Sequence, residues 1–270
     1  MKKKGIALVE RQYLFPFVLI TSLFFLFVFA HAILDVLNKH FQELLTITRT
    51  HSAMIQATMY MGYFIMAIPA GLFINRHGYR KGVVLGLLLY GIGSLLFIPG
   101  QYIASFNMFL FSLFVIGCGL TFLETAANPY VTELGARETA ASRLNFAQSF
   151  NGLGCIFAPI LTGLLLFSDE DKGASGNVAL PYAVMGVIVL LAALAFMRVR
   201  LPEIPHEEEV DSEGHRVGLW AHKLFVFGLV ALFAYEVSEI SINSFFINYV
   251  TEVGWMNARD ASLVLSFGGL

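Results

Sequence analysis

Apolar residues in this 270-residue chain form long uninterrupted runs separated by short polar stretches. A helix needs about 20 consecutive apolar residues to cross a bilayer. Because the runs are continuously apolar rather than alternating, they favour helices over barrel strands, and they predict an all-α polytopic membrane protein. The predicted helices cover residues 14–38, 52–75, 82–99, 106–131, 143–168, 179–199 and 221–250, and a further helix begins near Asp260.

Composition agrees with a lipid environment. Hydrophobic residues make up 57% of the chain and charged residues only 13%, which is too little polar surface for a soluble domain of this length. The net charge of -2 argues against a nucleic-acid partner. Cys118 and Cys155 both fall within predicted helices, without a Cys-x-x-Cys pair or a Cys/His cluster. We therefore expect no disulfide framework, no metal site and no cofactor.

Lysine and arginine are distributed unequally between the two sides of the predicted bundle. One side receives Lys39, Arg49, Lys172 and Arg259, and the other receives the remaining 13 of the 17 cationic residues. Cytoplasmic loops carry the excess of positive charge, so the N-terminus and the segment 201–220 are predicted to be cytoplasmic. This segment has two prolines and an acidic run, which is typical of a flexible linker.

The order of helices suggests a duplicated architecture. Residues 1–200 are predicted to form a six-helix bundle, 201–220 a linker, and 221–270 the start of a second bundle with one complete helix and one partial helix. Repeated six-helix halves are a transporter architecture. The first helices of the two groups carry polar residues at similar helical spacing, namely His31, Asp35 and Asn38 in one and Glu236, Glu239 and Asn243 in the other. We expect about five more helices in a complete second half, and no transport by residues 1–270 alone.

Polar residues within the other spans fall on single helical faces. The stripes are Gln56, Tyr60 and Tyr63; Thr121, Glu124 and Asn128; and Asn145, Gln148 and Asn151. Such residues usually face a bundle interior or a water-filled cavity, although single amides also join helices to one another. The set is rich in neutral hydrogen-bonding groups, and no lysine or arginine falls near the middle of a span. It predicts a polyhydroxylated neutral ligand, such as a sugar, with the two tyrosines against its apolar ring faces.

Two carboxyl groups, Asp35 and Glu124, lie within predicted spans. Removal from water favours the neutral form of a carboxylic acid, so such a group can take up a proton at neutral pH and release it when its surroundings change. Intramembrane carboxyls are costly and usually functional, although a hydrogen-bonded structural role is the alternative. We therefore expect the proton occupancy of one or both groups to be coupled to sugar occupancy.

Three stretches resemble a known family. Residues 71–82, GLFINRHGYRKG, are similar to the helix 2–3 loop signature of the major facilitator superfamily, with Asn75 where an acidic residue is usual. The stretches LETAANPYVTELG (123–135) and SRLNFAQSFNGLG (142–154) resemble the fucose–galactose–glucose:proton symporter family, most of all L-fucose permeases. The resemblance covers about residues 14–270. The stretch EISINSFFINYV (239–250), in the predicted helix 221–250, is more similar to the glucose/galactose branch.

The resemblance implies a twelve-helix transporter of the bacterial inner membrane that works by alternating access, as a monomer in the lipid bilayer when full length. Its substrates would be L-fucose or a related hexose together with protons. Asp35 and Glu124 would be the proton-coupling carboxyls, and Gln148 would contact the sugar. His31, Ala32 and Leu34 stand where the fucose pattern has asparagines, so His31 could replace a sugar contact. With the stripes above, the expected sugar-binding residues are His31, Gln56, Tyr60, Tyr63, Glu124, Asn128, Asn145, Gln148, Asn151, Glu239 and Asn243.

Three alternatives compete with a transporter. Seven complete spans would also suit a receptor or photosensor. A retinal protein needs a lysine within its last span, however, and the predicted helix 221–250 has only Lys223 at its start. A sugar-sensing relative that does not transport is harder to separate by sequence. An intramembrane enzyme is disfavoured, because there is no HExxH motif and no serine with a placed base.

Overall fold

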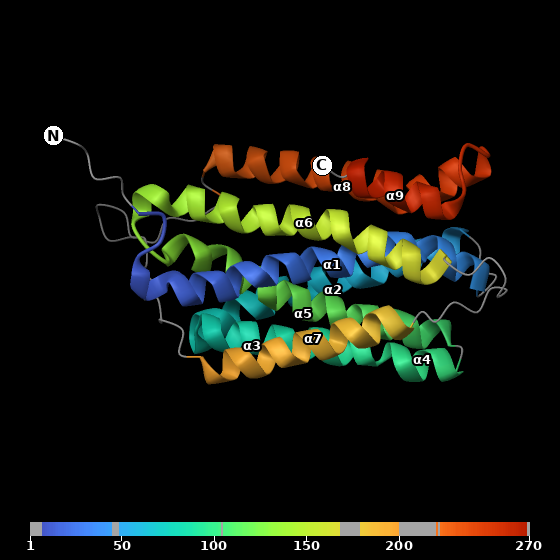
Figure 1. The fold of residues 1–270 in the computed structure, drawn as a ribbon. Helices are drawn as coiled ribbons and strands as arrows, with labels where there is room; N and C mark the ends of the chain where they lie inside the picture. Colours follow the sequence, from blue (N-terminus) through green and yellow to red (C-terminus); the bar gives the residue numbers. More distant parts are fainter. Residues whose placement is uncertain are drawn as a thin grey trace.

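A computed structural model describes residues 7–44, 49–103, 105–167, 179–199, 220 and 222–268. The regular elements in these ranges are helical, which agrees with the predicted fold class (Figure 1). Two short 3-10 turns, η1 (Arg11–Tyr13) and η2 (Arg137–Thr139), precede α1 and α6. The main helices are α1 (Leu14–Leu44), α2 (Arg49–His77), α3 (Tyr79–Leu95), α4 (Phe97–Ile103), α5 (Phe106–Glu133), α6 (Ala140–Phe167), α7 (Ala179–Arg198), α8 (Lys223–Glu252) and α9 (Ala258–Gly268).

The third predicted helix is divided into α3 and α4. Pro99 has no N–H to donate to the carbonyl of Leu95, which lies four residues earlier and is the last residue of α3. The helical direction resumes at once, because the Leu96 N–H donates to the carbonyl of Ile92 and the Gly100 N–H to that of Leu96. The two helices together therefore still provide one membrane-length stretch, Tyr79–Ile103.

Six stretches of the described helices are long and apolar enough to cross a membrane. They lie in α1, α2, α3–α4, α5, α7 and α8. The predicted span at 143–168 is helical, since α6 has 28 residues, but its described part does not reach the same hydropathy. The reason is that Arg143, Asn145 and Gln148 all fall in its first half. The chain is a multi-pass membrane protein in which α6 carries these polar residues in its first half.

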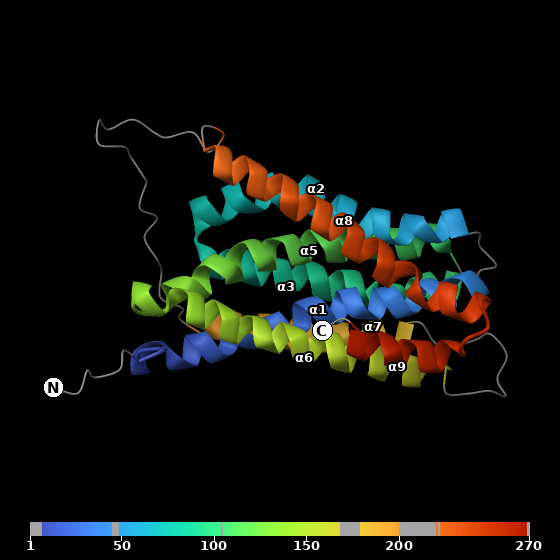
Figure 2. The same cartoon turned by 90° about the horizontal axis from the view of Figure 1, so that it is seen from above.

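The helices lie roughly along one axis and form two groups (Figures 1 and 2). In the first group, α5 packs against α2 and α3, and α7 packs against α3. In the second, α6 packs against α1 and α9, and α8 packs against α9. The spanning window of α5 is 61% buried, whereas that of α8 is 0% buried. α5 is therefore the centre of the bundle, and α8 lies on its margin.

Glycines allow α2, α3 and α5 to approach closely. A Cβ atom on Gly117 of α5 would lie 2.3 Å from the Met59 carbonyl oxygen of α2. A Cβ atom on Gly119 would lie 2.5 Å from the Tyr90 nitrogen and 2.7 Å from the Gly86 oxygen of α3. Small residues at helix contacts are the usual means of close packing in membranes, where backbone atoms meet directly.

We predict that Gly119→Ala destabilises the protein by about 1–3 kcal/mol, the usual cost of overpacking a well-packed core. The added methyl group meets backbone atoms, which cannot rotate away. The matched control is Gly71→Ala in α2, where an added Cβ meets nothing within 4 Å. Thermal stability of the detergent-solubilised variants tests this, and equal stability of the two variants would contradict it.

Arg143, at the start of α6, joins three segments at one end of the bundle. Its side chain is fully buried. Its Nε donates to the Val131 carbonyl at 3.0 Å, and its Nη1 donates to the Thr139 hydroxyl at 2.6 Å. It also donates to the carbonyls of Leu8, Ala136 and Thr132. One guanidinium therefore ties the end of α5, the start of α6 and the segment before α1 together.

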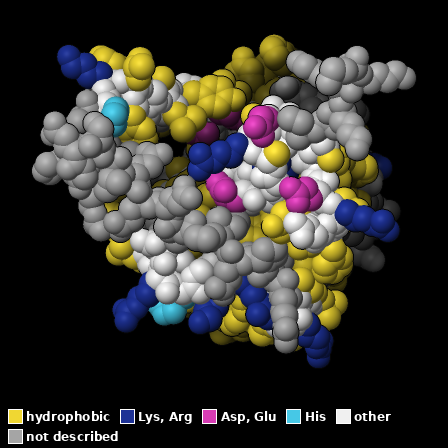
Figure 3. All heavy atoms as spheres, turned by 90° about the vertical axis from the view of Figure 1, so that its left-hand side faces the viewer, with side chains coloured by type: hydrophobic (Ala, Val, Ile, Leu, Met, Phe, Trp, Pro, Cys, Tyr) yellow, Lys and Arg dark blue, Asp and Glu magenta, His cyan; other side chains and the backbone are white. Residues whose placement is uncertain are grey.

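Cationic side chains surround this same end of the molecule (Figure 3). Arg76, Arg80 and Lys81 lie at the α2–α3 turn, Arg198 lies at the end of α7, and Lys223 lies at the start of α8. The predicted linker 201–220 lies outside the described residues apart from Trp220.

Candidate functional site

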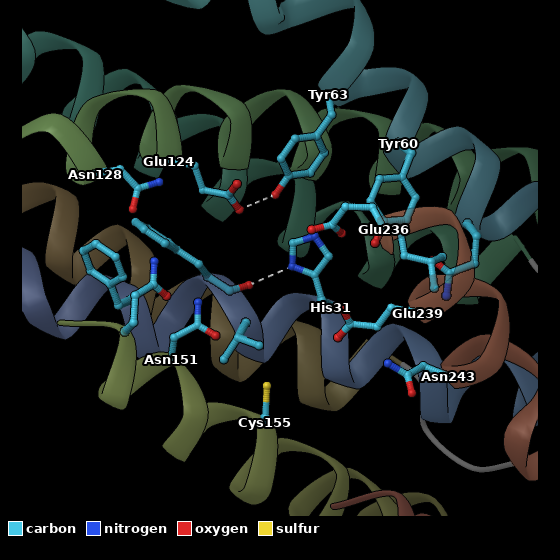
Figure 4. A pocket seen from close by; sticks show the side chains of 16 residues that line it. His31, Tyr60, Tyr63, Glu124, Asn128, Asn151, Cys155, Glu236, Glu239 and Asn243 are labelled. Carbon is cyan, nitrogen blue, oxygen red and sulfur yellow. Dashed lines mark hydrogen bonds between the residues drawn. The ribbon is translucent and has the colours of Figure 1, made fainter. Parts of the chain in front are cut away.

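A cavity of about 490 Å³ lies between the two helix groups, within the size range of small-molecule sites (Figure 4). Five helices line it, namely α1, α2, α5, α6 and α8. Its walls combine carboxyl, amide, phenol and imidazole groups with a few apolar side chains. The lining residues are Phe24, Phe27, Val28, His31, Gln56, Tyr60, Tyr63, Glu124, Asn128, Gln148, Asn151, Cys155, Glu236, Glu239, Ile240 and Asn243.

Glu124 of α5 and Tyr63 of α2 form a hydrogen-bonded pair on one side of the cavity (Figure 4). The Tyr63 hydroxyl donates to Glu124 Oε1 at 2.7 Å. The close α2–α5 packing at Gly117 and Gly62 holds these two side chains within reach of each other. Hydrogen bonding to one carboxyl oxygen leaves the other oxygen to carry a proton or to accept from a ligand. The predicted intramembrane carboxyl is therefore positioned by a partner that helical periodicity cannot identify.

His31 of α1 faces this pair together with Tyr60. Its ring centroid lies 5.7 Å from that of Tyr63 and 6.0 Å from that of Tyr60. His31 Nδ1 lies 3.2 Å from the Phe27 carbonyl oxygen. Since a carbonyl only accepts, Nδ1 is the protonated nitrogen, and Nε2 of the neutral ring is an acceptor. Glu124 also interacts electrostatically with His31 and with Glu236 of α8, so five ionisable or phenolic groups share one region.

Amide side chains supply the remaining hydrogen-bonding groups. Asn128 lies one turn after Glu124 on α5, and Asn151 projects from α6 on the opposite side (Figure 4). The Asn128 Oδ1 atom is buried and accepts no hydrogen bond within the described part of the chain. A buried acceptor without a donor costs free energy, on the order of 1–3 kcal/mol. A ligand hydroxyl that donates to this oxygen would remove that cost.

Helix α8 adds carboxyl groups on the side of the second bundle. Glu239 and Asn243 line the cavity as predicted from their spacing, and Glu236 lines it as well. Sequence reasoning left Glu236 out of the site, although it shares a helical face with Glu239 and Asn243. Cys155 was also missed, and its position one turn after Asn151 was the available signal. The cavity lining, as far as the structure describes it, contains no lysine or arginine.

Two predicted site residues are not brought to the cavity by the described structure. Asn145 of α6 is exposed and does not line it. A three-residue step rotates about 300° around a helix, so a stripe with that spacing drifts by about 60° at each step. Gln148 and Asn151 stay on the cavity side, whereas Asn145 turns away from it. Asp35 lies in α1, one turn after His31, and its side chain lies outside the described residues.

Thr121 belongs to the predicted α5 stripe, but its hydroxyl donates a hydrogen bond within its own helix, to the Gly117 carbonyl at 2.8 Å. Within the described ranges, no three His, Cys, Asp or Glu side chains are grouped for metal binding. The described lining of the cavity therefore consists of hydrogen-bonding organic groups and a few apolar side chains.

Comparison with known proteins gives one consistent family. A profile described as the Major Facilitator Superfamily matches residues 19–270. The "Glucose/galactose transporter" of Brucella abortus is 34% identical over 259 residues, which cover 94% of this chain and 63% of the relative. The "L-fucose-proton symporter" of Escherichia coli is also 34% identical, over 95% of this chain and 64% of the relative. The chain thus spans less than two thirds of the length of these curated relatives.

Solved structures agree with this result. The E. coli fucose:proton symporter FucP superposes with a TM-score of 0.71 and is 30% identical, over 95% of this chain and 68% of that one. These matches confirm the family resemblance and the predicted helical membrane fold. The chain belongs to the major facilitator superfamily and, within it, to the fucose–galactose–glucose:proton symporter family.

Proposed function

We propose that the protein containing this chain is a proton-coupled sugar transporter that imports L-fucose or a related hexose by alternating access. The observation that carries the proposal is a cavity between helix groups in which a carboxyl–phenol pair adjoins several amides. The names of the relatives, a fucose:proton symporter and glucose/galactose transporters, support the same solute class. The glucose/galactose relatives make those hexoses the second candidate substrates.

In this proposal, Glu124 binds both the proton and the sugar. With a proton on its second oxygen, the carboxyl group is neutral and can donate to a sugar hydroxyl, while Tyr63 continues to donate to Oε1. Without the proton, the group is an anion that only accepts. The two states therefore bind sugar with different affinities, and sugar must change proton affinity by the same factor. Asp35 is proposed as a second proton-coupling carboxyl, and the coupling needs no cofactor.

The remaining walls suit a neutral polyol. His31 Nε2 and Asn128 Oδ1 accept hydrogen bonds, and the amides of Gln148 and Asn151 both donate and accept. The Tyr60 ring provides a flat apolar surface for a pyranose ring. An anionic sugar phosphate would require a cation, and the described lining has none.

The charge distribution supports a proposal for the orientation. We propose a multi-pass protein of the bacterial inner membrane, functional as a monomer, with its N-terminus in the cytoplasm. The cationic end of the bundle, which includes Arg76, Lys81 and Arg198, would face the cytoplasm because cytoplasmic loops carry the excess of positive charge (Figure 3). The cavity would then be reached from either side by changes in the relative position of the two bundles.

We predict that adding the correct sugar to de-energised cells expressing the full-length protein makes a weakly buffered medium more alkaline. Proton entry with sugar removes protons from the medium, and the added sugar is the only driving force. L-fucose, D-galactose and D-glucose are added in turn while the external pH and the uptake of labelled sugar are recorded. Uptake of labelled sugar without any pH change would contradict proton coupling. Absence of both with every sugar would contradict the assigned substrate class.

A further inference from the structure

A second pocket lies at the cationic end of the bundle, away from the central cavity. It has a volume of about 340 Å³ and forms where the α2–α3 turn meets the last turn of α7. Figure 3 shows the end of the molecule at which this turn lies. The lining residues are His77, Gly78, Arg80, Lys81, Val84, Leu85, Leu88 and Met197.

The mouth of this pocket is cationic and partly fixed. Arg80 Nε donates to the Phe196 carbonyl at 3.2 Å, and its Nη2 donates to the Met197 carbonyl. The guanidinium is thus held over the end of α7, with its Nη1 donors unused by the described residues. His77 stacks on Phe73 with ring centroids 4.4 Å apart, which fixes its ring as well. Lys81 is exposed and supplies a movable second cation.

The wall of the pocket is apolar and runs along the membrane-spanning part of α3. Val84, Leu85 and Leu88 follow the cations within two helical turns, and Met197 of α7 closes the other side. A free phosphate or a soluble metabolite would gain little from this wall. A ligand that has an anionic head and a hydrocarbon chain matches both parts at once. Basic pockets between membrane helices at a cytoplasmic surface are suited to lipid head groups.

We propose that this pocket binds an anionic phospholipid. The phosphate lies against Arg80, Lys81 and His77, and one acyl chain follows Val84, Leu85 and Leu88 into the bilayer. Bidentate contact with phosphate suits the free guanidinium donors of Arg80. Bound in this way, the lipid joins the α2–α3 turn to the end of α7, which Arg80 already connects.

The acidic run at residues 207–213 is the competing occupant. Its negative carboxylates are complementary to the positive charge at the mouth of the pocket. They belong to Glu207, Glu208, Glu209, Asp211 and Glu213. It offers no hydrocarbon chain for the apolar wall, and for this reason we favour the lipid. Neutralising the acidic residues distinguishes the two occupants. If the acidic segment fills the pocket, lipid binds only after neutralisation, and if the lipid fills it, lipid binds without neutralisation.

The test uses the purified, delipidated full-length protein and native mass spectrometry with phosphatidylglycerol titrated in detergent. We expect one phosphatidylglycerol to bind more tightly than the rest. Removing one cation weakens this binding about fivefold, and reversing it weakens binding about 30-fold, so Lys81→Gln and Lys81→Glu should form a graded pair. The matched control is Lys223→Glu, an exposed lysine at the same end but outside the pocket, which should bind as the unmodified protein does.

Further measurements distinguish an anionic-lipid site from a simple phosphate site and from a site for the acidic segment. Phosphatidylcholine should bind more weakly than phosphatidylglycerol, and inorganic phosphate at the same concentration should not displace the lipid. Displacement by phosphate would show a phosphate site without a role for the apolar wall and would overturn the proposal. Unchanged affinity in both Lys81 variants would overturn it too. Binding that appears only after neutralising Glu207, Glu208 and Glu209 would assign the pocket to the acidic segment.

Discussion

Cells expressing full-length protein with Glu124→Gln should exchange sugar across the membrane but fail to accumulate it. One proton crossing 100 mV supplies about 2.3 kcal/mol, enough for a sugar gradient of about 50-fold. Glutamine keeps the size of the side chain and an oxygen that accepts from the Tyr63 hydroxyl, but it cannot release or take up a proton. We therefore expect the accumulation ratio to fall from about 50-fold to one.

The measurement compares counterflow of labelled sugar in preloaded vesicles with uptake driven by an imposed proton gradient. Glu133→Gln is the control, because Glu133 lies at the end of the same helix, is exposed and does not line the cavity. Counterflow in the Glu124 variant should continue and lose its dependence on pH. Gradient-driven accumulation at the unmodified level would remove Glu124 from the coupling mechanism.

Arg143→Met should be the most destabilising single substitution at the cationic end of the bundle. Methionine keeps much of the apolar stem but removes all five donated hydrogen bonds. Hydrogen bonds to charged groups contribute about 1.5–3 kcal/mol each, and acceptors left buried cost a further 1–3 kcal/mol. Some carbonyls will regain water, so we expect a net loss of about 3 kcal/mol or more.

The unfolding temperature of the solubilised protein, followed by fluorescence-detected gel filtration, measures this effect. Arg143→Lys should give an intermediate loss, because one ammonium group keeps the charge but cannot reach acceptors in all the directions of a guanidinium. Arg198→Met serves as the control, since Arg198 is exposed at the end of α7. If Arg143→Met and Arg198→Met unfold at the same temperature, the buried hydrogen bonds contribute nothing measurable.

The helices were predictable because a bilayer imposes both length and apolar composition. Every predicted membrane run corresponds to helix in the structure. The break near Pro99 was not predictable from proline alone, because Pro69 and Pro129 lie inside continuous helices. Helix ends were less predictable: α1 continues to Leu44 rather than ending near residue 38. Backbone hydrogen bonding continues past the apolar run into more polar sequence, where hydropathy no longer indicates a helix.

The site was partly predictable, because periodicity assigns a side chain to a face of its own helix. That information placed Glu124 with Asn128, and Gln148 with Asn151. It could not reveal which residue on another helix contacts Glu124, because Tyr63 lies 61 positions away in the chain and meets it only through α2–α5 packing. It also did not indicate that Asn145 lies away from the cavity, since a three-residue spacing drifts around the helix.

The glycine contacts of α5 also bear on how the cavity can change shape. Where backbone meets backbone, at Gly117 and Gly119, no flexible side chain lies between the helices to absorb a displacement. Helices α2, α3 and α5 therefore behave as a stiff unit, and the Tyr63–Glu124 distance is internal to that unit. Any motion of the second bundle relative to the first leaves this distance constant. The same motion alters the separation of Glu124 from Glu236 and Glu239, which belong to α8 of the second bundle.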